Sequence, residues 1–336
     1  MPSTLRIGMI GAGRMAHVHV QHLKALDPNL EIAAVFSRTA EHARSAAAEW
    51  GAPRAYTDVH QLLDEVELDA VYICTPTFIH AELGLLCAER DLPMFVEKPL
   101  DLNVALGLQL AEAVEARDLI NVTAFHWRYS QGFQRARDLI GDDPVALVNL
   151  RWYWTRPPIQ WMWQRALAGG QIVDQNIHLV DLSRGLAGEI QTVYAAYNAR
   201  QVNFEDEFDN WDAYAVNFTY ANGAVGLCAG TYGLFPDIQV GPVADFALRD
   251  RLIRITPEGV TLYTPDGVQT WQNREPFHLG VNRAFVRALR SGDRSGLVTP
   301  IRSALWSTAA TLAANHSAQR GQPVELAHFV AEQAAQ

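Results

Sequence analysis

Two short segments of the sequence carry side chains that suit charge and proton transfer. In the first, Glu97-Lys98-Pro99 follows an apolar run at 93–96 that is typical of a strand. Lys98 is one of only two lysines among 27 Lys and Arg residues, which indicates a need for a compact ammonium with a tunable pKa. Such a group can stabilise the negative charge that develops on an alcohol oxygen as hydride leaves. The alternative is an exposed surface lysine.

The second segment contains Asp174, His178 and Asp181. Their spacing of i, i+4 and i+7 would align them on one face of a helix expected over 170–186. An imidazole suits proton transfer near neutrality, and an aspartate one turn away can bind substrate or orient the ring. The alternative is a helix with a solvated polar face. For Asp181 we favour a structural role.

The elements that must position these side chains begin at the start of the chain. An apolar run at 5–10 leads into a glycine turn, and a helical pattern follows at once. Gly11 suits the tight turn, Gly13 the close approach of a pyrophosphate, and Ala16 the packing of helix on strand. The N–H groups at a helix N-terminus bind anions. The residues expected to hold a dinucleotide here are Gly11, Gly13, Arg14, Met15 and Ala16.

The next strand, expected at 31–36, ends without the acidic residue that usually binds the ribose of NAD. Ser37 and Arg38 follow it, and a hydroxyl beside a guanidinium suits a 2′-phosphate. We therefore expect NADP in preference to NAD. The alternative is that Ser37 only caps the next helix.

Strands and helices alternate through the first third of the chain, a pattern typical of parallel strands joined by helices. We predict a doubly wound, Rossmann-type parallel sheet over 1–125, with its site at the carboxyl ends of the strands. Thr75 and Pro76 end one of these strands and are expected to lie at the rim of the same site. An ordinary turn is the alternative.

The pattern changes after residue 125. Long alternating strands and two hairpin signals, Ala221-Asn222-Gly223 and Thr264-Pro265-Asp266-Gly267, predict a large, open, mostly antiparallel sheet. The second domain is then α+β and covers 126–336; whether its helix over 301–318 packs back on the first domain is open. One face of the sheet lacks obvious helical cover, so we expect a homo-oligomer, a dimer or tetramer, to bury it.

Four side chains are further candidates for substrate binding. His126 and Arg128 follow the last parallel strand, and Trp161 and Trp163 belong to an aromatic segment. Indole rings can cover the C–H surface of a sugar, and a guanidinium can bind a hydroxyl or carboxylate. The alternatives are core packing for the tryptophans and a structural ion pair for Arg128.

Composition narrows the classes of protein to consider. The chain has 336 residues, enough for two domains, and a net charge of −10 that argues against nucleic-acid binding. No apolar run approaches the ~18 residues of a membrane span, and no signal-peptide pattern is present. The three cysteines are scattered, which favours a reduced, cytoplasmic protein without a structural metal. His17, His19 and His22 share a helix, but not with metal-ligand spacing.

Four motifs occur in a recognisable order: the glycine turn, Thr75-Pro76, Glu97-Lys98-Pro99, and Gly169-Gly170 followed by Asp174 and His178. Over essentially the whole chain they resemble the glucose–fructose oxidoreductase/inositol dehydrogenase (Gfo/Idh/MocA) family. On the cofactor side, the resemblance implies that the glycine turn holds the pyrophosphate. It also implies that Thr75 and Pro76 pack against the dinucleotide and that Glu97 contacts the nicotinamide ribose.

On the reaction side, the resemblance implies that Lys98 bonds the reacting oxygen, with a cis peptide bond to Pro99 allowed. Asp174 would bind substrate, and His178 would be the general acid/base. The sequence departs from the family's pattern at Thr77, Gln175 and Asn176. These departures do not change the expected class of reaction, but they leave the identity of the substrate open.

Together these features predict an oxidoreductase that moves hydride between a nicotinamide dinucleotide and a secondary alcohol or ketone of a sugar, polyol or derivative. For this, Lys98, Asp174 and His178 must converge at one nicotinamide face. Two alternatives stay open. One is a nucleotide-binding regulator without turnover, and the other is an enzyme that uses bound NAD for transient oxidation during glycoside cleavage or elimination.

Overall fold

The computed structural model describes residues 4–235, 238 and 240–335, which divide into two compact units. The first unit contains the chain up to His126 together with His278–Leu305, and the second contains Trp127–Phe277 and the chain from Trp306. The sequence predicts one change of domain, near residue 126. In the structure the chain also returns to the first unit, and helix α10 (Ile301–Arg320) begins in the first unit and ends in the second.

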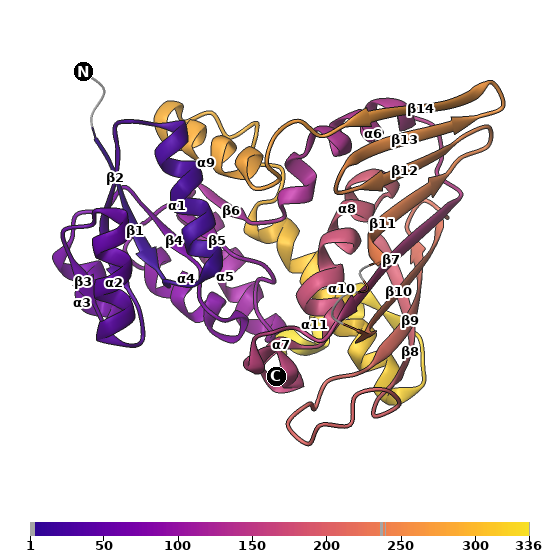
Figure 1. Cartoon of the computed structure of the whole chain (residues 1–336), viewed down its shortest axis with the longest axis horizontal. Coiled ribbons are helices and arrows are strands. Elements are labelled where there is room, and N and C mark those ends of the chain that lie inside the picture. Colours follow the sequence, from indigo (N-terminus) through magenta and orange to yellow (C-terminus); the bar gives the residue numbers. More distant parts are fainter. Residues whose placement is uncertain (1–3, 236–237, 239, 336) are drawn as a thin grey trace. The chain divides into compact units, whose positions relative to one another are not determined.

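The sheet of the first unit has six parallel strands in the order β3-β2-β1-β4-β5-β6 (Figure 1). The strands are β1 (Leu5–Ile10), β2 (Leu30–Phe36), β3 (Ala55–Tyr56), β4 (Ala70–Ile73), β5 (Met94–Val96) and β6 (Asn121–Thr123). This is the strand order of dinucleotide-binding doubly wound sheets, as predicted. Every residue of β4 and β5 is buried, because helices cover both faces of a parallel sheet.

Helices cover this sheet, and most of them connect its strands. They are α1 (Arg14–Leu26), α2 (Ala40–Trp50), α3 (Val59–Glu65), α4 (His80–Ala88), α5 (Val104–Ala116) and α9 (Leu279–Ser291), with a 3₁₀ turn η1 (Thr77–Ile79) before α4. Side chains that accept a backbone N–H begin several of them: Thr39 for α2, Asp58 for α3 and Asn103 for α5. The returning helix α9 packs against α1.

The sheet of the second unit has nine strands in the order β14-β13-β12-β11-β7-β10-β9-β8-β15. The strands are β7 (Leu147–Thr155), β8 (Ile190–Asn198), β9 (Ala213–Tyr220), β10 (Val225–Leu234), β11 (Val240–Ala247), β12 (Leu252–Thr256), β13 (Gly259–Thr264), β14 (Gly267–Gln272) and β15 (Val324–Glu325). Neighbours pair antiparallel except β7 and β10, which are parallel. The predicted large, mostly antiparallel sheet is confirmed.

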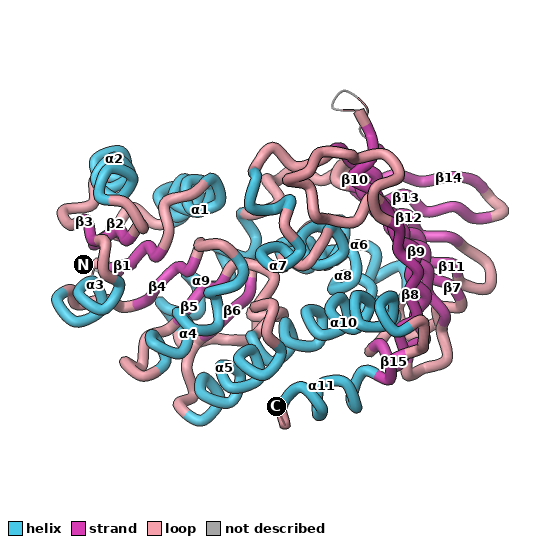
Figure 2. The backbone as a smooth tube through the Cα atoms, turned by 90° about the horizontal axis from the view of Figure 1, so that it is seen from below, coloured by secondary structure: helices cyan, strands magenta, loops and turns pink. Residues whose placement is uncertain are grey.

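Helices α6 (Gln131–Ile140), α8 (Ile177–Ala187) and the second-unit part of α10 lie on one face of this sheet (Figures 1 and 2). The other helical segments of the unit are η2 (His126–Tyr129), of which His126 belongs to the first unit, η3 (Gln160–Trp163), α7 (Arg165–Ala168), η4 (Ile172–Asn176) and α11 (Leu326–Ala334). Strand β9 alternates strictly, with Val216 and Phe218 turned to the core and Asn217 and Thr219 exposed. That alternation is expected for a sheet with helices on one face only.

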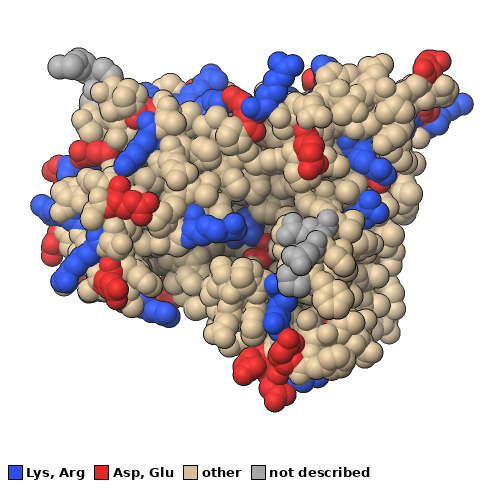
Figure 3. All heavy atoms as spheres, in the orientation of Figure 1, with Lys and Arg blue, Asp and Glu red and all other residues tan. Residues whose placement is uncertain are grey.

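None of the described helices is both long and apolar enough to cross a membrane. On the face drawn in Figure 3, acidic and basic side chains are interspersed.

Candidate active site

The glycine turn after β1 has a backbone that only glycine can supply. Gly11 has φ +112°, and a Cβ at this position would lie 2.4 Å from the carbonyl oxygen of Cys74, which follows β4. Ala16 is fully buried on the inner face of α1. The two small residues therefore let α1 start close against the sheet.

The N-terminus of α1 is built to receive an anion. Its N-cap is the exposed Gly13, and no side chain caps the helix. A Cβ on Gly13 would meet nothing within 4 Å, so the space before the first turn is open. Arg14, which is exposed, and Met15, which is half-buried, begin the helix. Backbone N–H groups and the positive end of the helix dipole are thus available to a pyrophosphate, which fits a dinucleotide.

The end of β2 carries the two residues that bear on NADP. The N-cap of α2 is Thr39, whose side chain accepts the N–H of His42, so Ser37 does not cap that helix. Ser37 is half-buried and donates its backbone N–H to the carbonyl of Tyr56. Arg38 is exposed and pairs with no other described side chain.

The loops after β4 and β5 are tied together by a histidine that the sequence analysis did not single out. The buried His80 lies with Nε2 2.8 Å from the carbonyl oxygen of Thr75 and Nδ1 2.8 Å from that of Pro99. Thr75 and Pro76 are half-buried, and Thr75 Oγ1 is buried without a hydrogen-bond partner in the described part of the chain. A hydroxyl left without a partner here fits a polar group of a bound dinucleotide.

Glu97 and Lys98 follow β5 directly, and the peptide bond between Lys98 and Pro99 is cis. The buried Glu97 carboxylate accepts a hydrogen bond from His19 Nε2 at 2.7 Å and one from the backbone N–H of Lys98 at 3.1 Å. Burial alone would raise the pKa of Glu97. The hydrogen bond from His19 and nearby positive charge, Lys98 included, outweigh it and lower the pKa to about 2. Glu97 is therefore ionised and held beside Lys98, which is half-buried.

In the second unit, the helix predicted over 170–186 starts differently. Ile172–Asn176 forms a π-helical turn, and α8 follows it. Such turns are frequent at functional sites because they widen the helix locally. Asp174 lies in the turn and His178 in the first turn of α8, both buried, so the predicted single α-helical face is interrupted.

Two tyrosines of the sheet hold this turn. Tyr232 Oη, on β10, donates to Asp174 Oδ2 at 3.2 Å, and both side chains are buried. Tyr214, on β9, accepts a hydrogen bond from the side-chain amide of Asn176. Burial and the adjacent Asp174 carboxylate raise the pKa of Tyr232 well above its usual value, so its hydroxyl stays protonated and donates.

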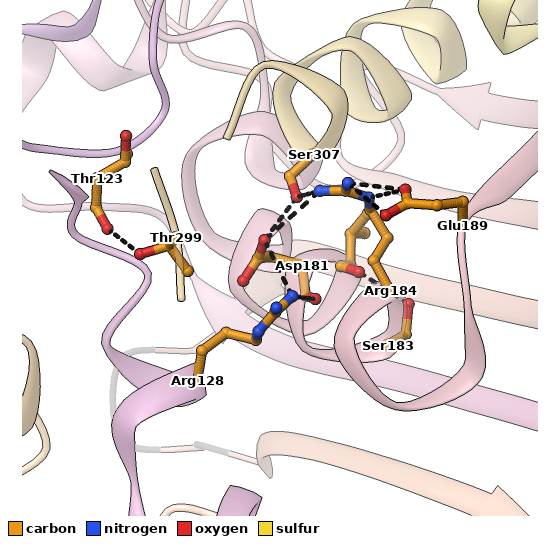
Figure 4. A network of polar contacts seen from close by, with 9 residues as sticks. Thr123, Arg128, Asp181, Ser183, Arg184, Glu189, Thr299 and Ser307 are labelled. Atoms are coloured by element: carbon orange, nitrogen blue, oxygen red, sulfur yellow. Dashed lines mark hydrogen bonds and ion pairs between the residues drawn. The ribbon is translucent and has the colours of Figure 1, made fainter. Parts of the chain in front are cut away.

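Asp181 has the structural role that we favoured for it (Figure 4). Ser307 donates to its Oδ1 at 2.7 Å, and the guanidinium groups of Arg128 and Arg184 lie 3.9 and 3.7 Å from the same oxygen. Burial raises the pKa of Asp181, and the two arginines counteract part of this effect. Arg184 also pairs with Glu189 and donates to Ser307. The network joins α8 to α10 and η2.

Arg128 therefore forms the ion pair that was the alternative to substrate binding. It also donates to the carbonyl of Asp181 at 3.3 Å, and its guanidinium fills the space that a Cβ on Gly185 would take. Trp163 donates Nε1–H to the carbonyl of Pro157 and lies under the guanidinium of Arg156. These contacts favour local structural roles for Arg128 and Trp163.

The ring of His126 lies 4.1 Å from that of His278, centroid to centroid, within the first unit. Trp161 is half-buried in η3. Substrate binding by either stays a prediction, as does the joint action of Lys98 with Asp174 and His178. Among the described residues, no group of three or more His, Cys, Asp or Glu side chains could hold a metal ion.

The sequence analysis missed His80, Tyr232 and Asn282, and it considered His19 only as a metal ligand. For two of them a signal existed. His19 lies on the buried stripe of α1 with Ala16, Val20 and Leu23, and Asn282 interrupts the apolar stripe of α9. A polar side chain on an inward stripe needs a partner, which marks both positions for attention.

Two family models match the chain. The model described as "Oxidoreductase family, NAD-binding Rossmann fold" matches residues 5–126, and the "GFO/IDH/MocA C-terminal domain" matches residues 108–237. Among curated relatives, myo-inositol 2-dehydrogenase of Thermotoga maritima is 28% identical over 66% of this chain and 67% of its own length. The scyllo-inositol 2-dehydrogenase (NAD(+)) of Bacillus subtilis is 25% identical over 97% of both.

Solved structures share the fold along the whole chain. Levoglucosan dehydrogenase in complex with NADH and levoglucosan has a TM-score of 0.85 and 18% identity, over 96% of this chain and 99% of its own. The WlbA dehydrogenase from Bordetella pertussis, in complex with NADH and UDP-GlcNAcA, has a TM-score of 0.82 and 20% identity, with the same coverage. At these identities the likeness concerns the fold.

Proposed function

Because the chain belongs to the Gfo/Idh/MocA family of NAD-binding oxidoreductases, we propose that it transfers hydride between a nicotinamide dinucleotide and a secondary alcohol or ketone of a sugar, cyclic polyol or derivative. One observation carries the proposal. Lys98 follows the carboxyl end of β5, and the same chain buries Asp174 and His178 at a π-helical turn. Relatives named as inositol dehydrogenases support the substrate class.

The bound dinucleotide supplies the hydride acceptor in oxidation and the hydride donor in reduction. The chain's own part is to hold the substrate oxygen and move its proton. In oxidation, His178 takes the hydroxyl proton while the Lys98 ammonium stabilises the negative charge on the oxygen. Asp174 holds a substrate hydroxyl through its carboxylate, which Tyr232 orients. In reduction, His178 returns the proton.

The test is a panel of cyclic polyols and sugars, read by the absorbance of the reduced nicotinamide with NAD and NADP in parallel. Lys98→Met and His178→Ala should each lower kcat about 10²–10⁴-fold, the usual loss for a positioned acid or base, with cofactor affinity nearly intact. Lys24→Met, at the exposed second lysine, is the matched control and should keep full activity. Full turnover in Lys98→Met or His178→Ala would contradict these roles.

The same panel separates the two alternative functions. Binding of cofactor with no turnover of any substrate would favour a regulator. Product formation without release of free reduced cofactor would favour transient oxidation during elimination or glycoside cleavage.

For the cofactor, we propose a preference for NADP, supported by Arg38 and Ser37 at the end of β2. Arg38 is exposed and unpaired within the described part of the chain, and Thr39 rather than Ser37 caps α2. Arg38→Ala should therefore raise KM for NADP well above its effect on KM for NAD. Equal effects on both cofactors would refute this preference.

We also propose that the open face of the nine-stranded sheet is buried against a second copy of the chain. Four exposed apolar side chains lie together on it: Tyr194, Leu227, Val225 and Leu147. Leu147 faces Val225 across β7 and β10, and Leu227 lies two residues on in β10. Tyr194 of β8 lies in the same row as Leu227, with Asn217 of β9 between them. An exposed apolar group of this kind on a sheet face favours self-association.

A further inference from the structure

We infer that Asn282 and His19 are positioning residues for Glu97 and Lys98, so that the segment returning to the first unit completes the cofactor end of the site. The inference rests on the proposed function for the roles of Glu97 and Lys98. The contacts that carry it lie entirely within the first unit.

The side chains of Asn282, His19 and Glu97 form a continuous, buried series of hydrogen bonds. His19 Nε2 lies 2.7 Å from Glu97 Oε1, and His19 Nδ1 lies 2.9 Å from Asn282 Nδ2. Asn282 Nδ2 also donates to the carbonyl oxygen of His278 at 2.7 Å. His19 and Asn282 have no exposed surface, and Glu97 is only 6% exposed. Because water does not reach them, these groups depend on one another for hydrogen bonds.

The backbone carbonyl of His278 determines which groups donate and which accept in these hydrogen bonds. A carbonyl oxygen only accepts, so the Asn282 amide must turn its NH₂ toward it, and the same NH₂ then faces His19 Nδ1. Nδ1 is therefore the acceptor, and the ring proton lies on Nε2, where it is donated to Glu97. Asn282 thus selects the His19 tautomer that can bind a carboxylate.

The chain of hydrogen bonds continues to the backbone of the lysine. Glu97 uses its second oxygen, Oε2, to accept the N–H of Lys98. One carboxylate thereby links the helix α1 that begins at the glycine turn to the backbone of Lys98. Loss of the donor on His19 would leave a buried carboxylate oxygen unpaired and free the Glu97-Lys98 segment to shift.

Aromatic packing holds the His19 ring in place. Its centroid lies 4.7 Å from that of Phe95 on β5 and 5.8 Å from that of Tyr72 on β4. Phe285, three residues after Asn282 on α9, contacts both of these rings edge-on. The same helix therefore supplies the amide that orients His19 and a ring that packs against its neighbours.

Two amide variants of His19 separate positioning from mere structure. His19→Gln places an N–H close to where Nε2 lies and keeps the donor to Glu97, whereas His19→Asn is too short and keeps only the polarity. Both remove the ring, so both should lower Tm similarly. His19→Gln should keep the Kd for NADH, read by cofactor fluorescence, within about threefold of wild type. His19→Asn should weaken it about tenfold or more, as loss of a bond to a charged group does.

The tautomer gives a second readout that needs no turnover. In ¹⁵N spectra of histidine-labelled protein, the His19 signals, identified by their loss in His19→Gln, should show a protonated Nε2 and an unprotonated Nδ1. In Asn282→Leu, which removes the donor, NADH affinity should fall as in His19→Asn. Equal NADH affinity in His19→Gln and His19→Asn, or a proton on Nδ1 alone, would overturn the inference.

These outcomes are distinct from failure of the proposed function. If no polyol or sugar is turned over but the tautomer and the difference between the Gln and Asn variants hold, the proposed reaction fails and the positioning role stands. If substrates are turned over and the two variants bind NADH equally, the positioning role fails alone.

Discussion

Tyr232→Phe tests whether Asp174 acts on substrate. The substitution removes one hydroxyl and keeps the buried ring, so its main effect is loss of the 3.2 Å hydrogen bond to Asp174 Oδ2. Both side chains are buried, so water does not replace the lost donor. A hydrogen bond to a charged group contributes about 1.5–3 kcal/mol, and the long distance places this one near the lower limit.

A loss of about 1.5 kcal/mol corresponds to about tenfold in an equilibrium or rate ratio. If Asp174 holds a substrate hydroxyl, Tyr232→Phe should lower kcat/KM for the substrate about tenfold through KM. The Kd for NADH should stay unchanged. Steady-state kinetics with a substrate found in the panel measures the first, and NADH fluorescence measures the second.

Tyr214→Phe is the matched control. It makes the same change on the neighbouring strand β9 and removes the hydroxyl that accepts from Asn176, two residues after Asp174 in the same turn. Tyr214→Phe should therefore cost stability, measured as Tm, with little change in KM. Equal changes of kcat/KM in both variants, or less than a twofold change in Tyr232→Phe, would refute a substrate-binding role for Asp174.

Three further predictions concern stability and assembly. The pKa of Glu97 is lowered, so its contribution to stability is present above the ordinary value of 4.5 and is lost as pH falls through the lowered pKa. Glu97→Gln should flatten this part of the pH dependence in urea unfolding, and parallel profiles would contradict the assignment. Gly11→Ala should destabilise the protein by about 2–4 kcal/mol, because Gly11 has a positive φ and an added Cβ would collide with the carbonyl of Cys74. Gly13→Ala should keep Tm and weaken NADH binding. Equal losses of Tm in the two variants would count against this turn geometry. Leu227→Glu should dissociate the oligomer in analytical ultracentrifugation, and an unchanged sedimentation coefficient would remove the sheet face as its interface.

The features that the sequence predicted well depend on residues close together in the chain. The apolar run at β1, the glycine turn and the small Ala16 define one strand–turn–helix unit, and alternation along β9 defines a sheet covered on one face. Glu97-Lys98-Pro99 was placed at a strand end by the same reasoning. In each case the physical cause is local periodicity or backbone geometry.

The partners of the site residues depended on packing between distant segments. His19 meets Asn282 from 263 positions away, and Asp181 meets Ser307 from 126 positions away. The π-helical turn at Asp174 likewise departs from the α-helix that its residue spacing indicates. Sequence by itself determined which elements form and which side chains could do chemistry. Only the tertiary structure decided which buried polar groups pair, because any of several donors could satisfy a buried carboxylate and close packing selects one.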